Sequence, residues 1–251
     1  MRVLISILKK KDYQKLLITF DGGGTNWRET LLPQYKAQRV SMPEDLWKQL
    51  EEIKLLLEKT NVACIYLTDC EADDLITSFI KQNKKTYPNL VFDIFTRDKD
   101  LLQLLDKNTN ILKYIKGKIT LYADEDFWKE YNFSPSNFAD YLSLLGDNID
   151  NIKGVKGIGP VSAKNLIQQF YTVENIYQQK DNLPENNRKL LEGNQGLVYR
   201  NKKITSLVED IPLPTNLYEK CNFNWEEWKK NNELKKFCVE NNFKSILRLL
   251  D

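Results

Sequence analysis

The sequence contains no histidine, and this absence narrows the chemistry that the chain can perform. It excludes Ser-His-Asp and Cys-His triads, zinc sites with histidine ligands, and histidine as a general base. Catalysis by this chain would therefore depend on carboxylates, lysine, tyrosine, cysteine, or metal ions bound through oxygen.

Cysteines and long apolar runs are also scarce. The 4 cysteines have no Cys-x-x-Cys spacing, which is typical of isolated thiols in a reducing compartment rather than of a disulfide framework. The apolar segment at residues 2–8 is too short to span a membrane, and lysines follow it directly. We therefore expect a cytoplasmic protein with no signal peptide and no membrane attachment.

Charge is balanced, with 37 basic and 35 acidic residues and a formal net charge of +2. A nucleic-acid surface would therefore require local segregation of the basic residues. The length of 251 residues and the 41% hydrophobic content suit one large domain or two small ones with a real core.

The first half of the chain alternates between predicted strands and helices. Short apolar runs predict strands at residues 16–20, 62–67 and 91–95. Helices are predicted from Pro43 and over residues 71–82, the first because Leu46, Trp47, Leu50, Ile53 and Leu57 recur at helical spacing. This alternation favours a mainly parallel sheet covered by helices on both faces.

A further helix is predicted at residues 98–105 and a β-hairpin at residues 111–122, centred on Lys116-Gly117-Lys118. After about residue 123 the strand signals stop. The remaining segments indicate helices, including residues 124–131, 135–145 and 160–170. The sequence therefore predicts an α/β half followed by a helical half.

Carboxylates gather in four groups: Asp21; Glu71, Asp73 and Asp74; Asp98 and Asp100; Asp147 and Asp150. Three of the groups follow predicted strands, where ligand sites form in parallel α/β sheets. Converging carboxylates repel one another unless cations neutralise them, and Mg²⁺ and Mn²⁺ prefer such oxygen ligands. Two such ions, roughly 3.5–4 Å apart, support phosphodiester cleavage. Acids also occur in the first turn of helices simply to complement the helix dipole, but four groups, three of them at successive strand ends, argue against that alternative.

A glycine-rich stretch at residues 154–160 precedes a predicted helix that contains Lys164. Glycine allows close approach of the backbone to a phosphate, and amides at a helix N-terminus bind the anion. Lys153, Lys156 and Lys164 add positive charge without reading sequence. The alternative is an ordinary turn between helices, but the position directly after Asp147 and Asp150 favours phosphate binding.

A second basic segment covers residues 33–39 and is preceded by Arg28. Lys36 and Arg39 follow the loop that contains Asp21, so we expect them on the same side of the sheet, near a scissile phosphate. Tyr35 would either stack on a base or pack internally. Such basic residues more commonly lie in a loop exposed to solvent without binding a ligand, and this alternative stays open.

In this order and spacing, these segments resemble the 5′-3′ exonuclease and flap-endonuclease family, which includes the exonuclease portion of bacterial DNA polymerase I. The resemblance runs from about residue 16 to residue 250. It rests on Phe20-Asp21, Arg28, Tyr35-Lys36-Ala37-Gln38-Arg39, Glu71-Ala72-Asp73-Asp74, Asp98-Lys99-Asp100-Leu101, Asp140-Tyr141-Leu142 and residues 146–159.

The resemblance implies a fold and a set of site residues. The expected fold is a PIN-like (resolvase-like) α/β domain at residues 1–132 and a helical subdomain at residues 133–251 with a helix-three-turn-helix (H3TH) element. The implied metal ligands are Asp21, Glu71, Asp73, Asp74, Asp98, Asp100, Asp147 and Asp150, and the residues implied near the scissile phosphate are Lys36, Arg39 and Arg28. The implied DNA-binding residues, where the family often binds K⁺, are Lys153, Gly154, Val155, Lys156, Gly157, Ile158, Gly159 and Lys164.

The implied activity is hydrolysis of DNA near 5′ ends, flaps and nicks with Mg²⁺ or Mn²⁺, in replication and repair. The implied partners are DNA and a separate DNA polymerase, with the chain acting as a monomer. A catalytically impaired relative that still binds branched DNA is one alternative. A nuclease acting on RNA is another, and the hairpin of residues 154–159, which is implied to bind duplex DNA, argues against it.

The chain departs from the family pattern at its start. The family normally begins with a strand that ends in an Asp-Gly pair, followed by a helix, and this segment lies before the part that matches Met1. We therefore expect the first strand and its metal-binding aspartate to be missing and the chain to begin within the helix. The polymerase portion has no counterpart either, which implies a stand-alone nuclease module.

Overall fold

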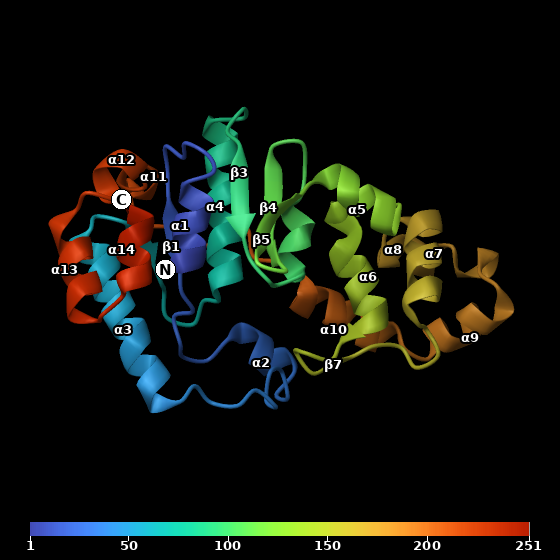
Figure 1. Ribbon diagram of the computed structural model, residues 1–251. Helices are drawn as coiled ribbons and strands as arrows, with labels where there is room; N and C mark the ends of the chain where they lie inside the picture. Colours follow the sequence, from blue (N-terminus) through green and yellow to red (C-terminus); the bar gives the residue numbers. More distant parts are fainter. Residues whose placement is uncertain (251) are drawn as a thin grey trace. The chain divides into compact units, whose positions relative to one another are not determined.

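A computed structural model describes residues 1–250 and divides the chain into two compact units (Figure 1). The first unit contains residues 1–23, residues 40–75 and the chain from Ile211 onward; the second contains residues 24–39 and 76–210. Helix α4 (Ala72–Thr86) contributes its first turn to the first unit and the remainder to the second. The expected domain division at residue 132 stays a prediction.

The first unit is built on a pair of parallel strands. Strand β1 (Leu17–Thr19) pairs with β2 (Ala63–Ile65), with Thr19 opposite Ile65. Apolar side chains of the surrounding helices pack into one core; the helices are α1 (Arg2–Leu8), α3 (Glu44–Lys59), α12 (Trp225–Trp228), α13 (Asn232–Glu240) and α14 (Lys244–Leu250). A short helix, α11 (Leu217–Lys220), precedes α12.

The second unit contains a three-stranded sheet. Strand β3 (Phe92–Phe95) runs parallel to β4 (Thr109–Ile115), which pairs antiparallel with β5 (Lys118–Tyr122). Lys116 and Gly117 both adopt positive φ, at 48° and 81°, as the two-residue turn of a hairpin requires. The predicted hairpin is therefore confirmed.

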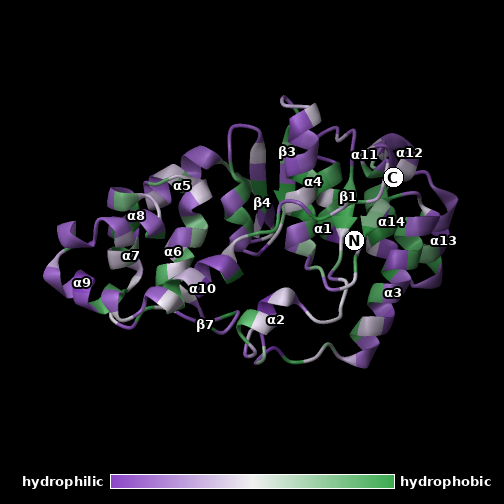
Figure 2. Ribbon diagram, turned by 180° about the vertical axis from the view of Figure 1, so that it is seen from behind, coloured by the Kyte–Doolittle hydropathy of each residue, from purple (hydrophilic) through white to green (hydrophobic). Residues whose placement is uncertain are grey.

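Helices make up the rest of the second unit: α2 (Trp27–Leu31), α5 (Asp124–Tyr131), α6 (Phe138–Leu145), α7 (Pro160–Phe170), α8 (Val173–Gln178), α9 (Glu185–Glu192) and α10 (Gln195–Thr205). Except for α2, the apolar faces of these helices share one core with the sheet, centred on fully buried side chains such as Phe127, Leu142 and Ile167. Leu31 of α2 packs in a smaller, separate cluster. Helix α9 is hydrophilic along most of its length (Figure 2).

Three local predictions were wrong. The helix predicted at residues 98–105 is a short 3₁₀ helix, η1 (Asp100–Leu104), and the helix predicted at residues 135–145 divides into η2 (Pro135–Asn137) and α6. A further 3₁₀ turn is η3 (Lys180–Asn182). Strands also occur after residue 123, because β6 (Gly146–Asp147) pairs with β7 (Ile152–Lys153). Two-residue strands have no periodicity that a sequence pattern would reveal.

Gly146 allows this small strand pair to form. It has a φ of 79°, and a Cβ atom there would lie 2.3 Å from the Gly154 nitrogen and 2.5 Å from the Ile152 oxygen. Gly146→Ala is expected to lower the free energy of unfolding by roughly 2–4 kcal/mol, because both the left-handed backbone and the overlap are unfavourable.

Gly196→Ala is the matched control, since Gly196 lies in α10 and a Cβ atom added there would have no other atom within 4 Å. Chemical denaturation should show this variant slightly more stable than the parent, by about 0.4–1 kcal/mol. Equal stabilities of the two variants would contradict the requirement for glycine at residue 146.

Candidate metal and nucleic-acid site

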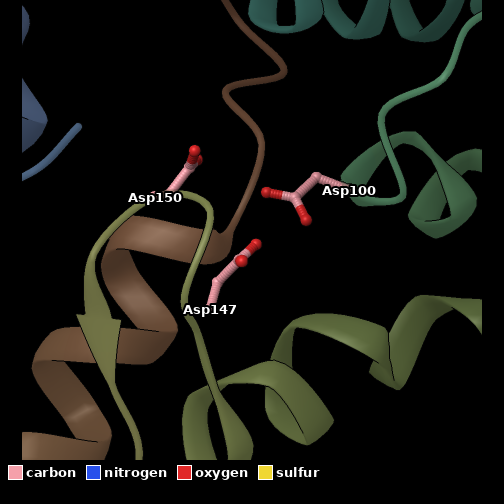
Figure 3. Close-up of side chains that lie close together, drawn as sticks. All are labelled: Asp100, Asp147 and Asp150. Carbon is pink, nitrogen blue, oxygen red and sulfur yellow. The ribbon is translucent and has the colours of Figure 1, made fainter. Parts of the chain in front are cut away.

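Three aspartates converge in the second unit. Asp100 opens η1 just after β3, Asp147 ends β6, and Asp150 lies in the loop between β6 and β7. One carboxylate oxygen from each of the three lies within 4.8 Å of the others. Figure 3 shows the three side chains pointing toward a shared space. Residues about 50 positions apart in the sequence are thus brought together by the turn after β3 and the small strand pair.

Asp98 holds the turn that presents Asp100. The Asp98 amide donates to Thr96 Oγ1 at 2.9 Å, and the Asp98 carboxylate accepts from the Asp100 amide at 2.9 Å. Oδ1 of Asp100 is buried and accepts no hydrogen bond from any residue of the described chain, 1–250. Burying a carboxylate oxygen without a hydrogen-bond partner costs free energy, so this atom is a candidate ligand for a cation.

The charge of this cluster is poorly neutralised around Asp100. Burial and, after it, the charges of Asp98, Asp147 and Asp150 raise the pKa of the Asp100 carboxyl to about 8, whereas the charge of Lys99 opposes the shift. Three converging carboxylates match the oxygen-rich, negatively charged donor set that Mg²⁺ and Mn²⁺ prefer, and a nearby cation would oppose the shift at Asp100. The residues present therefore fit a divalent cation.

Basic residues approach the cluster from the segment that follows α2. Arg39 Nη2 lies 2.6 Å from Asp150 Oδ1, and Lys36 Nζ lies 3.8 Å from Asp150 Oδ2. The Lys36 amide also donates to the Asp150 carbonyl at 3.1 Å, with Lys36 in the left-handed region at a φ of 54°. The structure thus brings together two of the predicted basic residues and one of the predicted acids.

Two contacts of the cluster were missed by the sequence analysis. Tyr35 is buried and its hydroxyl donates to Asp150 Oδ2 at 3.2 Å, while Lys99 Nζ lies 3.1 Å from Asp147 Oδ2. Lys99 stands between Asp98 and Asp100 in the sequence, and that position was the available signal for its role. Tyr35 had been left open between stacking on a base and packing internally, and it packs with Leu32 and its neighbours.

Arg28 occupies a different place from Lys36 and Arg39. Its side chain is only 2% exposed, and it donates to the carbonyls of Ile204 at 2.8 Å and Ser206 at 3.1 Å, at the end of α10. These bonds attach α2 to α10 and so support the segment that bears Lys36 and Arg39. A direct contact between Arg28 and a phosphate stays a prediction that this geometry does not favour.

The predicted DNA-binding hairpin has a buried side and an exposed side. Val155 and Ile158 are buried in the core, whereas Lys153 and Lys156 are exposed, and Gly157 has a φ of 94°. Helix α7 begins directly afterwards with Pro160 in its first turn. This arrangement leaves two lysines and a helix N-terminus on the solvent side, as phosphate binding requires.

Other polar residues hold this hairpin in position. Lys164 Nζ donates to the Glu130 carbonyl at 2.6 Å, which ties its ammonium group to the protein. Asn201 is fully buried, and its amide donates to the carbonyls of Ser143 at 3.1 Å and Lys153 at 2.8 Å. Nothing in the sequence distinguished Asn201 from other polar residues in a helix.

The acids of the first unit lie around the start of α4. Asp21 accepts from the Ala72 amide at 2.8 Å, and Asp74 is buried. Gly22 fits against the backbone of Leu67, where a Cβ atom would lie 1.7 Å from the carbonyl oxygen. As metal ligands, the residues of this unit stay sequence predictions: Asp21, Glu71, Asp73 and Asp74.

No helix within residues 1–250 is both long enough and apolar enough to cross a membrane.

Family models match nearly the whole chain. The model for the "5'-3' exonuclease, N-terminal resolvase-like domain" matches residues 1–132, and the model for the "5'-3' exonuclease, C-terminal SAM fold" matches residues 133–231.

Named relatives agree with this match. A 5′-3′ exonuclease of Mycoplasma genitalium is 34% identical over 84% of this chain and 73% of its own length. DNA polymerase I of Caldicellulosiruptor bescii is 34% identical over 99% of this chain, but the chain spans only 29% of that polymerase.

A solved structure of the T5 5′-exonuclease with divalent metal ions (zinc) aligns with a TM-score of 0.67 at 24% identity, covering 100% of this chain and 89% of that one. This likeness confirms the predicted fold class, a resolvase-like α/β domain with a helical C-terminal part. The chain therefore belongs to the 5′-3′ exonuclease family, a family of nucleases.

Proposed function

We propose that this chain hydrolyses phosphodiester bonds of DNA at 5′ ends, flaps and nicks, with a divalent cation bound by Asp100, Asp147 and Asp150. The observation that carries the proposal is the convergence of these three carboxylates around a buried, unbonded oxygen, with Lys36 and Arg39 beside them. Membership of the 5′-3′ exonuclease family supports it.

The aspartates would hold Mg²⁺ or Mn²⁺, and we keep two ions as the expected number. When bound, such ions activate water and stabilise the leaving oxygen in phosphodiester cleavage. Asp98 keeps Asp100 directed into the cluster, and Tyr35 orients Asp150 through its hydroxyl. Lys99 offsets part of the charge of Asp147, so the cluster stays compact.

Lys36 and Arg39 would bind the scissile phosphate. Both are held close to Asp150 by the turn in which Lys36 adopts a left-handed backbone. Cations positioned before the reaction stabilise the negative charge that develops on the phosphate oxygens. Outside the cluster, Lys153, Lys156 and the start of α7 would bind the duplex backbone without reading its sequence.

The test is cleavage of a duplex with a labelled 5′ flap in Mg²⁺, in Mn²⁺ and in EDTA. Metal-dependent release of the flap is the expected result, and an RNA flap should compete poorly. Structure-selective binding without cleavage in either metal would instead establish the catalytically impaired alternative. A separate DNA polymerase is the proposed partner of this chain in replication and repair.

Arg39→Gln is expected to change cleavage and cation binding in opposite directions. Loss of the guanidinium should lower kcat roughly 100-fold, because a positioned cation is removed from the reacting phosphate. The same change removes a positive charge that neutralises Asp150, so Mn²⁺ should bind severalfold more tightly. This gain in affinity corresponds to the free energy of one surface ion pair.

Isothermal titration with Mn²⁺ and single-turnover cleavage measure the two effects separately. Lys189→Gln is the matched control, because Lys189 forms an ion pair with Glu185 on α9, away from the aspartates. It should leave both quantities unchanged. If Arg39→Gln weakened Mn²⁺ binding, Arg39 would not act as a counter-charge to the cluster.

A further inference from the structure

Three aromatic rings surround one lysine in the first unit. Nζ of Lys54 lies 5.3 Å from the ring centre of Phe20, 5.6 Å from that of Trp47 and 4.9 Å from that of Tyr66. It also lies 2.8 Å from a carboxylate oxygen of Glu51, one turn earlier on α3. An ammonium group amid three rings binds each of them and so fixes their positions.

The strand pair explains why these rings meet. Phe20 directly follows β1 and Tyr66 directly follows β2, and the last residues of these parallel strands, Thr19 and Ile65, lie opposite each other. The carboxyl ends of parallel strands form one edge of the sheet, where ligand sites occur in α/β proteins. Asp21 follows Phe20 at the same edge.

The cluster is open to solvent on the side of two rings. Lys54 has a side chain only 18% exposed, whereas Trp47 is 50% and Tyr66 57% exposed. Large aromatic side chains normally contribute their area to a core, and an exposed group of them marks a binding surface. Here the lysine is enclosed and the rings it holds are presented outward.

We propose that Trp47 and Tyr66 form a stacking site for a nucleobase of an unpaired nucleotide in the DNA substrate. This inference rests on the proposed function, because it assigns the site to the same substrate. Bases stack on aromatic side chains whatever their identity, since every base has a π-face. Lys54 acts as a positioning residue that keeps the two rings fixed for the incoming base.

Charge favours a base over a phosphate or a polyanion at this surface. Helix α3 has an excess of acidic side chains: Glu44, Asp45, Glu51, Glu52 and Glu58, against Lys48, Lys54 and Lys59. Lys48 and Lys54 are themselves paired with Glu44 and Glu51. A phosphate would be repelled by this excess, whereas a neutral base is not.

The test uses a duplex whose unpaired 5′ strand contains 2-aminopurine, bound by the full chain in EDTA so that no cleavage occurs. Stacking should quench the 2-aminopurine fluorescence on binding. Trp47→Ala and Tyr66→Ala should each reduce this quenching and weaken binding about tenfold, the order expected for one stacked base. Trp47→Phe, which keeps a ring, should retain most of both effects.

Trp128→Ala is the matched control, because Trp128 is similarly exposed, at 45%, but lies on α5 in the second unit. It should leave quenching and affinity unchanged. An abasic flap should bind the parent chain as weakly as the intact flap binds Trp47→Ala. Quenching that survives in both alanine variants, or equal affinity for abasic and intact flaps, would overturn the stacking site.

Cleavage in Mg²⁺ is measured on the same substrates, which separates the two proposals. Normal cleavage by the parent chain without quenching would overturn the stacking site alone. Quenching lost in the alanine variants, but with no cleavage by the parent chain in any metal, would overturn the proposed hydrolysis and support the stacking site.

Discussion

Asp147→Asn is expected to lower the rate of flap cleavage at least about 100-fold, since a cation that stabilises the transition state by several kcal/mol loses a charged ligand. Asparagine has nearly the same size and keeps an oxygen that can accept from the Ile149 amide, as Asp147 does at 2.9 Å. The fold of the loop should therefore survive. What disappears is the negative charge that faces Asp100 and pairs with Lys99.

Single-turnover cleavage at saturating Mg²⁺ is the measurement, and thermal unfolding confirms that the variant is folded. Asp181→Asn serves as the control, because Asp181 is exposed on η3 in the same unit. It should cleave at the parent rate. A parent-like rate for Asp147→Asn would remove the aspartate cluster from the reaction.

Asp100→Asn is expected to stabilise the protein without divalent cations and to remove its stabilisation by them. The pKa of Asp100 is raised to about 8, above the ordinary aspartate value of 3.8, mainly by burial. Between these pH values the folded state keeps a proton that the unfolded state has lost. The stability contributed by this proton is therefore complete below about pH 4 and falls as pH rises toward 8.

At about pH 7.5 without cations, Asp100→Asn should melt several degrees above the parent chain, at roughly 2–4 °C per kcal/mol for a chain of this size. Adding millimolar Mg²⁺ or Mn²⁺ should raise the melting temperature of the parent but hardly that of the variant, because ligand binding stabilises only a competent site. Melting curves from pH 5 to 8 test both expectations. A parent chain whose stability rises over this range without cations would contradict the sign of the shift.

Much of the second-unit site followed from sequence position. Asp98 and Asp100 were predicted at a strand end and Asp147 and Asp150 before the glycine-rich hairpin, and three of these four converge. Lys36 and Arg39 were predicted near a phosphate and lie against Asp150. Sequence spacing was enough to predict these positions, because a short turn restricts the directions in which its side chains can point.

The contacts that support the site were not predictable in the same way. Asn201 bonds to carbonyls nearly 50 residues or more away in the chain, and Arg28 to carbonyls in α10. Such pairings depend on tertiary packing, which a local pattern does not encode. The helical spacing of α3 placed Trp47 with core residues such as Leu57, yet Leu57 is buried and Trp47 is half exposed. Helical periodicity identifies a helix, but it does not distinguish the side chains at the centre of the buried face from those at the edge of that face.

The most direct test of the central claim is anomalous diffraction from crystals soaked in Mn²⁺. An anomalous peak should lie between the carboxylates of Asp100, Asp147 and Asp150, with manganese-to-oxygen distances of about 2.0–2.6 Å. The same crystals of Asp147→Asn should show that peak weakened or lost. A chain that cleaves flaps in Mn²⁺ but shows no manganese among these three aspartates would contradict the account.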